Sequence, residues 1–168
     1  MKKMSVTMAW LSMFLGKGSG KKSMNSRKRN DSEAQLRGFI LDIRTYINKR
    51  LYNPDSELVQ LQFLDRSTRE NAATSTAIVQ QFFQRTKEQL QSYKSVISAI
   101  AVLEQDRFSQ NAKIKTVEVL EGMMGHCQFF YDRAESYRIY QQDGTVKRLL
   151  NHTIKNYLAT LEMFSEVN

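Results

Sequence analysis

Glycine, proline, cysteine and histidine are all scarce in this chain of 168 residues, which contains seven Gly, one Pro, one Cys and two His. The single cysteine, Cys127, cannot form an internal disulfide, and His126 and His152 alone offer few ligands for a metal. So few helix breakers, among many Gln, Glu, Lys, Leu and Ala, favour long helices over strands and turns. The composition therefore predicts an all-α protein in a reducing compartment, with no metal and no cofactor.

Long hydrophobic runs are also missing. The longest apolar stretch, residues 4–15, has 12 residues, whereas a helix needs about 20 to span a bilayer. Lys2 and Lys3 precede this stretch as in a secretory signal, but Lys17, Lys21 and Lys22 follow where a cleavage site needs small uncharged residues. We therefore expect no transmembrane helix, and the sequence favours a retained segment over an export signal.

Positive charge is in excess, but only at one end of the chain. Residues 1–30 contain eight Lys and Arg and no acidic residue, so they account for the whole net charge of +8. The other 17 basic residues are balanced by 17 acidic ones. Attraction to anionic lipid or nucleic acid is therefore expected from this arm alone, and nucleic-acid binding by the folded body is not expected.

The N-terminal arm combines apolar and basic side chains in a pattern typical of membrane-surface segments. Trp favours the membrane interface, and each Lys or Arg near an anionic leaflet adds about 1 kcal/mol. We predict an arm over residues 1–32, with a membrane-seeking apolar tip and a flexible, disordered basic linker over 16–32. The predicted membrane-binding residues are Met4, Met8, Trp10, Leu11, Phe14, Leu15, Lys17, Lys21, Lys22, Arg27, Lys28 and Arg29.

Two other interpretations of the arm stay open. The basic cluster of residues 27–29 could serve as a nuclear or nucleic-acid patch. Alternatively, the tip packs against the folded domain or stays disordered.

Residues 33–168 show the periodicity of amphipathic helices and are predicted to form one all-helical interaction domain. Ser32 and Gln35 have the spacing of a capping box, and the apolar positions that follow predict a helix over 34–51. Pro54 is expected to end that helix. A short second helix, which would complete a helical hairpin, is predicted from Leu58, Leu61 and Leu64.

Three longer helices are predicted after the hairpin. A second capping box, Ser67 and Glu70, starts a heptad-like series that ends at Ile100. Ser109 is expected to cap the next helix. The turn at residues 143–144 precedes the last helix. We expect these helices to form an antiparallel bundle or a coiled-coil-like domain. Their predicted apolar positions are Ala72, Thr76, Val79, Phe83, Thr86, Leu90, Tyr93, Ile97 and Ile100; Ile114, Val117, Leu120, Met124, Cys127, Phe130, Ala134 and Tyr137; and Val146, Leu149, Leu150, Ile154, Tyr157, Leu158, Leu161 and Phe164.

Two glycines, Gly122 and Gly125, interrupt the second of these long helices. Each costs a helix up to about 1 kcal/mol relative to Ala. The sequence therefore predicts a close contact between helices, or a kink, at these positions.

Side chains that could carry chemistry are few, and each has a structural interpretation. Residues 16–21 contain glycines and lysines like a phosphate-binding loop, but no strand precedes them, no helix follows them and the glycine spacing differs. His126 and Cys127 are adjacent on a predicted helix, so their side chains diverge by about 100°. We interpret Cys127 as a core thiol, His126 as a boundary residue and His152 as a surface residue.

The aromatic residues of the same region could stack on nucleic-acid bases, but their helical spacing and neutral surroundings favour core packing. They are Phe129, Phe130, Tyr131, Tyr137 and Tyr140. With no catalytic motif recognised, we predict a protein that is not an enzyme.

Residues 47–64, Ile-Asn-Lys-Arg-Leu-Tyr-Asn-Pro-Asp-Ser-Glu-Leu-Val-Gln-Leu-Gln-Phe-Leu, resemble a segment of the C proteins of paramyxoviruses. In those proteins a similar helix, a Pro-containing turn and a Glu-Leu-Val-Gln helix start occur in the same order. The tip, residues 7–15 with Trp10, followed by basic residues, is also similar to that family. The total length and the all-helical character agree as well.

The resemblance implies a non-structural accessory protein, encoded in an alternative frame of the phosphoprotein gene and without enzymatic activity. Such a protein down-regulates viral RNA synthesis through the viral polymerase complex and antagonises interferon signalling through host STAT-family factors. Some members also recruit the Bro1-domain adaptor of the membrane-scission machinery. The expected location is the host cytoplasm, partly at membranes.

Two questions stay open on the sequence alone. The heptad-like seam does not decide whether the helices pair within one chain or across a homodimer. The alternative to the C-like interpretation is a bacterial or phage helical-bundle adaptor or structural protein with an N-terminal export signal or anchor.

Overall fold

A computed structural model describes residues 24–52, 69–135 and 145–166 of the chain. These residues form four α-helices and one short π-helix, and no β-strand occurs among them. The α-helices are α2 (Met24–Ile47), α4 (Arg69–Ala99), α5 (Arg107–Asp132) and α7 (Thr145–Ser165); the π-helix η1 (Asn48–Tyr52) continues directly from α2. The all-α prediction is confirmed for this part of the chain.

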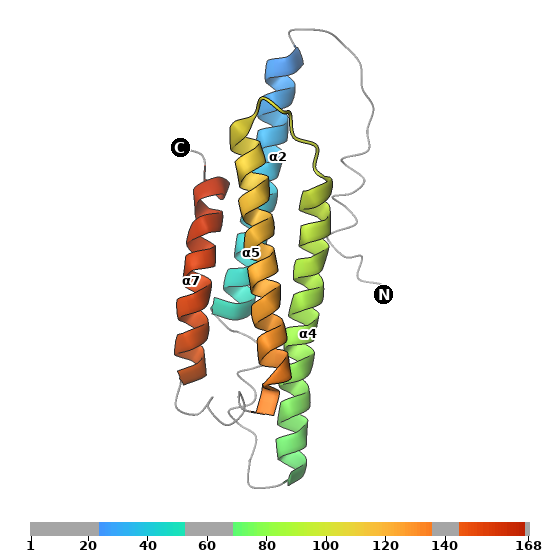
Figure 1. The fold of residues 1–168 in the computed structure, drawn as a ribbon, viewed down its shortest axis with the longest axis vertical. Coiled ribbons are helices and arrows are strands. Elements are labelled where there is room, and N and C mark those ends of the chain that lie inside the picture. The colour runs from blue at the N-terminus through green and yellow to red at the C-terminus, as the bar shows by residue number, and fades with distance from the viewer. Residues whose placement is uncertain (1–23, 53–68, 136–144, 167–168) are drawn as a thin grey trace.

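The α-helices lie side by side and alternate in direction along the chain (Figure 1). Helix α5 contacts both α4 and α7, and α2 packs mainly on α7. The polar contacts between α4 and α5 show the relative direction of these two helices. Near the end of α4, the Ser98 carbonyl accepts from Lys113 Nζ at 2.7 Å, whereas Lys87, further back, donates to Gln128 at 2.6 Å. These two helices therefore run antiparallel.

The core consists of apolar side chains that recur every three or four residues along each helix. The predicted seam of α4 is confirmed at Val79, Phe83, Leu90 and Ile97, which are at most 1% exposed. Phe82 joins them, so the buried face is wider than one seam because α4 contacts both α5 and α2. Each fully buried Leu or Phe stabilises the fold by about 1.5 to 3 kcal/mol, so this core accounts for most of the packing energy.

Helix α2 begins at Met24, upstream of the expected start. Ser32 and Gln35 are exposed residues inside the helix, so the predicted capping box is wrong, and residues 24–32 of the predicted flexible linker are helical. No Gly or Pro interrupts residues 24–32, so the helix extends upstream from its packed part at small cost. The predicted apolar face is confirmed at Leu36, Phe39, Ile40, Ile43, Ile47 and Leu51.

The far end of the first helix agrees with the prediction. The chain stays helical through η1 to Tyr52, two residues before Pro54. The predicted helix at Leu58 to Leu64, and with it the hairpin, lies outside the described residues, as does Ser67.

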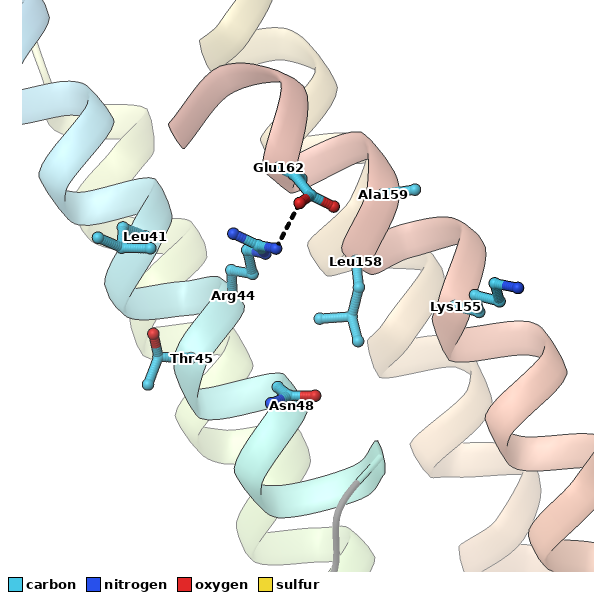
Figure 2. A pocket seen from close by; sticks show the side chains of 8 residues that line it. All are labelled: Leu41, Arg44, Thr45, Asn48, Lys155, Leu158, Ala159 and Glu162. Carbon is cyan, nitrogen blue, oxygen red and sulfur yellow. Dashed lines mark ion pairs between the residues drawn. The ribbon is translucent and has the colours of Figure 1, made fainter. Parts of the chain in front are cut away.

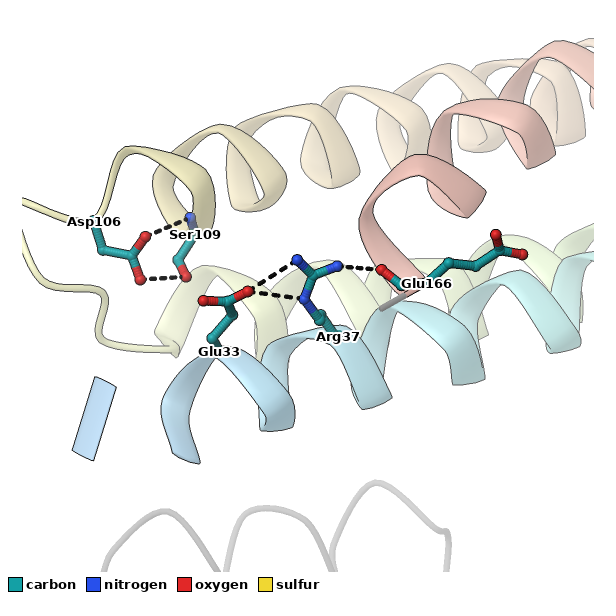
Figure 3. Close-up of polar contacts among 5 residues, drawn as sticks. All are labelled: Glu33, Arg37, Asp106, Ser109 and Glu166. Atoms are coloured by element: carbon teal, nitrogen blue, oxygen red, sulfur yellow. Dashed lines mark hydrogen bonds and ion pairs between the residues drawn. The ribbon is translucent and has the colours of Figure 1, made fainter. Parts of the chain in front are cut away.

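Helix α5 is capped by Asp106 and not by Ser109, which corrects the sequence prediction. Asp106 Oδ1 accepts from the backbone N–H of Ser109 at 3.1 Å, and Ser109 Oγ donates to Asp106 Oδ2 at 2.7 Å (Figure 3). Asp is among the preferred N-cap residues, and both of its carboxylate oxygens accept hydrogen bonds from Ser109. Helix α5 therefore begins at Arg107.

The buried face of α5 is wider than the predicted one, and one predicted position, Ile114, lies outside it. Ile114 is 56% exposed, whereas Thr116, Val119 and Met123 are buried. Helix α5 packs between two neighbours, and Thr116 is tolerated there because its hydroxyl donates to the Ala112 carbonyl at 2.7 Å. The predicted positions confirmed as buried are Leu120, Cys127, Phe130 and Ala134, and in α7 Ile154, Leu161 and Phe164.

Candidate functional site

Cys127, in α5, is the single cysteine of the chain, and its environment removes the reactivity of its thiol. The side chain is 2% exposed. Burial raises the pKa of the thiol from 9.0 to about 12, against a smaller lowering by Lys87 and Arg50. Since the thiolate is the reactive form, Cys127 is an inert core thiol, as predicted.

The two histidines have separate roles. His126 is half-buried, and its Nε2 lies 3.3 Å from the Tyr157 hydroxyl, at the contact between α5 and α7. His152 is exposed on α7. The boundary and surface interpretations are both confirmed, and no group of three His, Cys, Asp or Glu side chains that could hold a metal ion occurs among the described residues.

The aromatic residues of α5 divide between core and surface. Phe130 is 7% exposed and stacks on Phe83 with ring centroids 5.1 Å apart, so core packing is confirmed there. Phe129 is 44% exposed, with the Arg133 guanidinium 4.0 Å from its ring centroid, so core packing is wrong for this residue. Tyr131 packs partly buried against the core. Tyr137 and Tyr140 lie outside the described residues.

Of the two glycines of α5, one lies at a helix contact and the other is exposed. A Cβ at Gly122 would lie 2.9 Å from Cζ of Tyr157, so this glycine permits the close contact with α7 that the sequence predicted. Gly125 is exposed, and a Cβ there would meet no atom within 4 Å. Gly125, Phe129 and Arg133 therefore form an exposed patch on α5 that the internal packing does not explain; we call it the α5 patch.

A groove of about 460 Å³ lies between α2, η1 and α7. Figure 2 shows Arg44 crossing it, with Nη2 2.8 Å from Glu162 Oε1. Arg44 Nη1 also lies 3.6 Å from Glu166 Oε1. The lining residues are Leu41, Arg44, Thr45, Asn48, Lys155, Leu158, Ala159 and Glu162.

A second arginine of α2, Arg37, also contacts the end of α7. Arg37 pairs with Glu33 at 2.9 Å and donates to the backbone carbonyl of Glu166 (Figure 3). Its guanidinium also lies 4.1 Å from the ring centroid of Phe108. Arg37 therefore joins the end of α7 to α2 and to the start of α5.

Sequence reasoning missed this groove. Its two walls, residues 41–48 and 155–162, lie more than 100 residues apart in the chain. Periodicity identifies the buried face of each helix, but it does not state which two helices lie side by side or how far apart. No signal in the sequence could have located the groove.

The predicted membrane-binding residues are not brought together by the described structure. Residues 4–22 lie outside the described range; Arg27, Lys28 and Arg29 lie in α2, but their side chains are not described. In the described ranges, no helix combines the length and apolar character needed to cross a bilayer. The membrane-binding site stays a prediction.

No protein-family model, no curated protein and no solved structure matches the chain.

Proposed function

We propose that this protein is a non-enzymatic accessory protein that acts by binding other proteins. The observation that carries this class of function is that three side chains able to do chemistry are held in structural contacts. Cys127 is a neutral core thiol, Asp106 caps α5 and His126 contacts Tyr157. Such groups are not placed to act on a substrate, so surfaces remain as the means of action.

The choice of partners is supported by the resemblance of residues 47–64 to paramyxovirus C proteins. The proposed partners are host STAT-family factors and the viral polymerase complex, with the Bro1-domain adaptor of the membrane-scission machinery as a further one. Docking on a STAT factor would antagonise interferon signalling, and docking on the polymerase would down-regulate viral RNA synthesis.

The α5 patch is our proposed contact surface for a STAT factor. Interface hot spots are enriched in aromatic and Arg side chains that become desolvated on binding. Phe129 is 44% exposed and lies under the Arg133 guanidinium. Gly125, one turn earlier, leaves open space in which a partner backbone could approach closely.

The N-terminal arm is proposed to hold the protein at anionic membranes of the host cytoplasm. The apolar tip supplies the interfacial part and the basic residues supply the attraction to acidic lipid. The two activities are separable, because the arm and the α5 patch share no residue.

Partner binding is tested with the purified full-length protein and a purified STAT factor. We expect the double variant Phe129→Ala, Arg133→Ala to bind at least about tenfold more weakly than wild type. Gln91→Ala, an exposed change on α4, is the matched control and should bind as wild type does. If wild type binds neither the STAT factor nor the polymerase, the proposed function is wrong. If the double variant binds the STAT factor as tightly as wild type does, only the α5 patch is rejected as the contact surface.

The membrane activity is tested by co-sedimentation with vesicles of mixed neutral and anionic lipid. We expect wild type to co-sediment at moderate salt and the triple variant Trp10→Ala, Leu11→Ala, Phe14→Ala to stay in solution. Vesicles of neutral lipid alone are the control, because they remove only the electrostatic attraction. Wild type that stays in solution with anionic vesicles would contradict the proposal.

A further inference from the structure

The exposed side of α7 divides sharply by charge. Arg148, His152 and Lys155 lie on its first half, and residues 145–161 contain no acidic residue. Glu162 and Glu166 lie at its other end, and no basic residue follows Lys155. Basic residues near the start of a helix and acidic residues near its end oppose the helix dipole. The dipole of α7 therefore does not account for this order.

The same residues are spaced as a contact seam. Positions 148, 152, 155, 159, 162 and 166 follow steps of four and three, the spacing that keeps residues on one face against an antiparallel or parallel partner helix. The buried face of α7 uses other positions, Ile154, Leu161 and Phe164. Helix α7 thus has two faces with contact spacing, one of which packs within the chain.

Intrachain contacts use only part of this seam. Glu162 and Glu166 pair with Arg44, yet their side chains remain 47% and 58% exposed. Lys155 is exposed and forms no hydrogen bond or ion pair with any other described residue. Ala159, between the basic and acidic halves, is small and exposed.

We infer that α7 is the contact helix of a two-fold symmetric homodimer, with the axis passing close to Ala159. In an antiparallel pair centred there, Lys155 faces the partner's Glu162, and His152 faces the partner's Glu166. The two alanines meet at the axis, where small side chains let the helices approach closely. A parallel pair would place like charges opposite each other, so the charge order selects the antiparallel one.

Apolar residues beside the seam complete the surface. Met163 is 72% exposed and Leu41, on the groove wall of α2, is 44% exposed. The partner's α7 lying along the groove covers both side chains and their symmetry mates. A two-fold interface uses the same patch on both chains, so the opposite charges of this patch satisfy each other without another protein. This inference does not rest on the partners proposed above.

The first test measures the mass of the full-length protein by sedimentation equilibrium. We expect wild type to dimerise, and Lys155→Glu or Glu162→Lys each to raise the dimer dissociation constant about tenfold or more, because like charges then face each other twice. Mixing the two variants should restore association, since opposite charges face again in the mixed dimer. Helical circular dichroism shows that each variant is folded. Monomeric wild type, or no association on mixing, overturns the inference.

The second test locates the contact. Ala159→Cys places one thiol on each side of the axis, within reach of a disulfide, and native Cys127 is buried and inert. Under a mild oxidant we expect the Ala159→Cys variant to form a disulfide-linked dimer. The Gln91→Cys variant, changed at an exposed position on α4, should not cross-link. Cross-linking of Gln91→Cys but not of Ala159→Cys overturns the inference by placing the contact on another face.

Discussion

The pair α4–α5 and the pair α2–α7 are held together in different ways. Helices α4 and α5 are consecutive, joined by residues 100–106, and their interface is filled by large side chains such as Phe83 and Phe130. Helices α2 and α7 come from opposite ends of the described chain, and part of their contact is a groove crossed by Arg44. One pair is a closed core and the other is an open edge.

The connections at the ends of the two pairs show the same difference. Lys113 donates to the carbonyls of Ser98 and Ile100, both at 2.7 Å, and so satisfies acceptors that the end of α4 leaves free. Arg44 bonds instead to the exposed side chains of Glu162 and Glu166. The closed pair is held by buried rings and satisfied carbonyls, whereas the open edge carries half-exposed ion pairs.

Phe83→Ala should break the closed pair most severely. Phe83 is 1% exposed and contacts Phe130 and Phe82 with ring centroids at 5.1 Å. Removing such a ring from a core costs about 3 to 5 kcal/mol of unfolding free energy. Leu41→Ala, on the open edge, is the control and should cost less than about 1 kcal/mol in the monomer. Urea unfolding measures both; similar costs for the two would contradict the distinction.

High pH should weaken the buried contacts of the bundle before it affects the exposed ion pairs of the open edge. Burial raises the pKa of the Cys127 thiol from 9.0 and of the Tyr46 phenol from 10.0, each to about 12. The unfolded chain therefore loses these protons at lower pH than the folded chain. The stability from both neutral groups is fully present below pH 9 and is lost as the pH rises towards 12, by about 1.4 kcal/mol per pH unit and group.

The measurement for this pH effect is urea unfolding at several pH values between 8 and about 11. In Cys127→Ala the decline should begin nearer pH 10, because only the Tyr46 contribution remains. The rate of reaction of Cys127 with a thiol reagent should rise only on unfolding. A stability that stays constant up to pH 11 would mean that neither group is protected by burial.

Gly122→Ala and Gly125→Ala should change stability in opposite directions. The new Cβ at Gly122 meets Cζ of Tyr157 at 2.9 Å, so the half-buried Tyr157 ring must be displaced, at a cost of about 1 to 3 kcal/mol. The new Cβ at Gly125 meets nothing within 4 Å, so the gain in helix propensity of up to about 1 kcal/mol remains. Thermal unfolding followed by circular dichroism measures both changes; a gain in stability in both variants would contradict the tight contact between Gly122 and the Tyr157 ring.

Arg44→Ala should have the smallest effect on folding. Its ion pairs with Glu162 and Glu166 lie at the surface of the groove, where such pairs contribute about 0 to 1 kcal/mol. High salt should remove most of the difference from wild type. Arg44→Lys keeps the charge and serves as the control in the same urea titration; a loss as large as that of Phe83→Ala would show that the groove is part of the closed core.

Much of the secondary structure could be predicted from the sequence because helix periodicity is local. Val79, Phe83 and Leu90 recur on one face, and that face is the buried one. Helix ends were less predictable. Asp106 and Ser109 are both good capping residues, and the choice between them depends on where the chain turns after α4.

The α5 patch and the groove were harder to predict. Ile114 and Phe129 have the same apolar character as Val119 and Phe130, yet the first two are exposed and the last two are buried. Which side of α5 faces outwards depends on where α4 and α7 lie, and this is set by contacts between residues far apart in the sequence.

The sequence by itself determined that this chain forms long helices, which residues of α2 and α4 face inwards, and where the net charge of +8 lies. These properties depend on residue type and on spacings of three and four, which any stretch of chain carries with it. Only the tertiary structure decided that Gly122 meets Tyr157, that Cys127 is a neutral thiol and that α2 and α7 leave a groove. Each of these depends on a distance between separate helices, and such distances are set by the packing of the whole core.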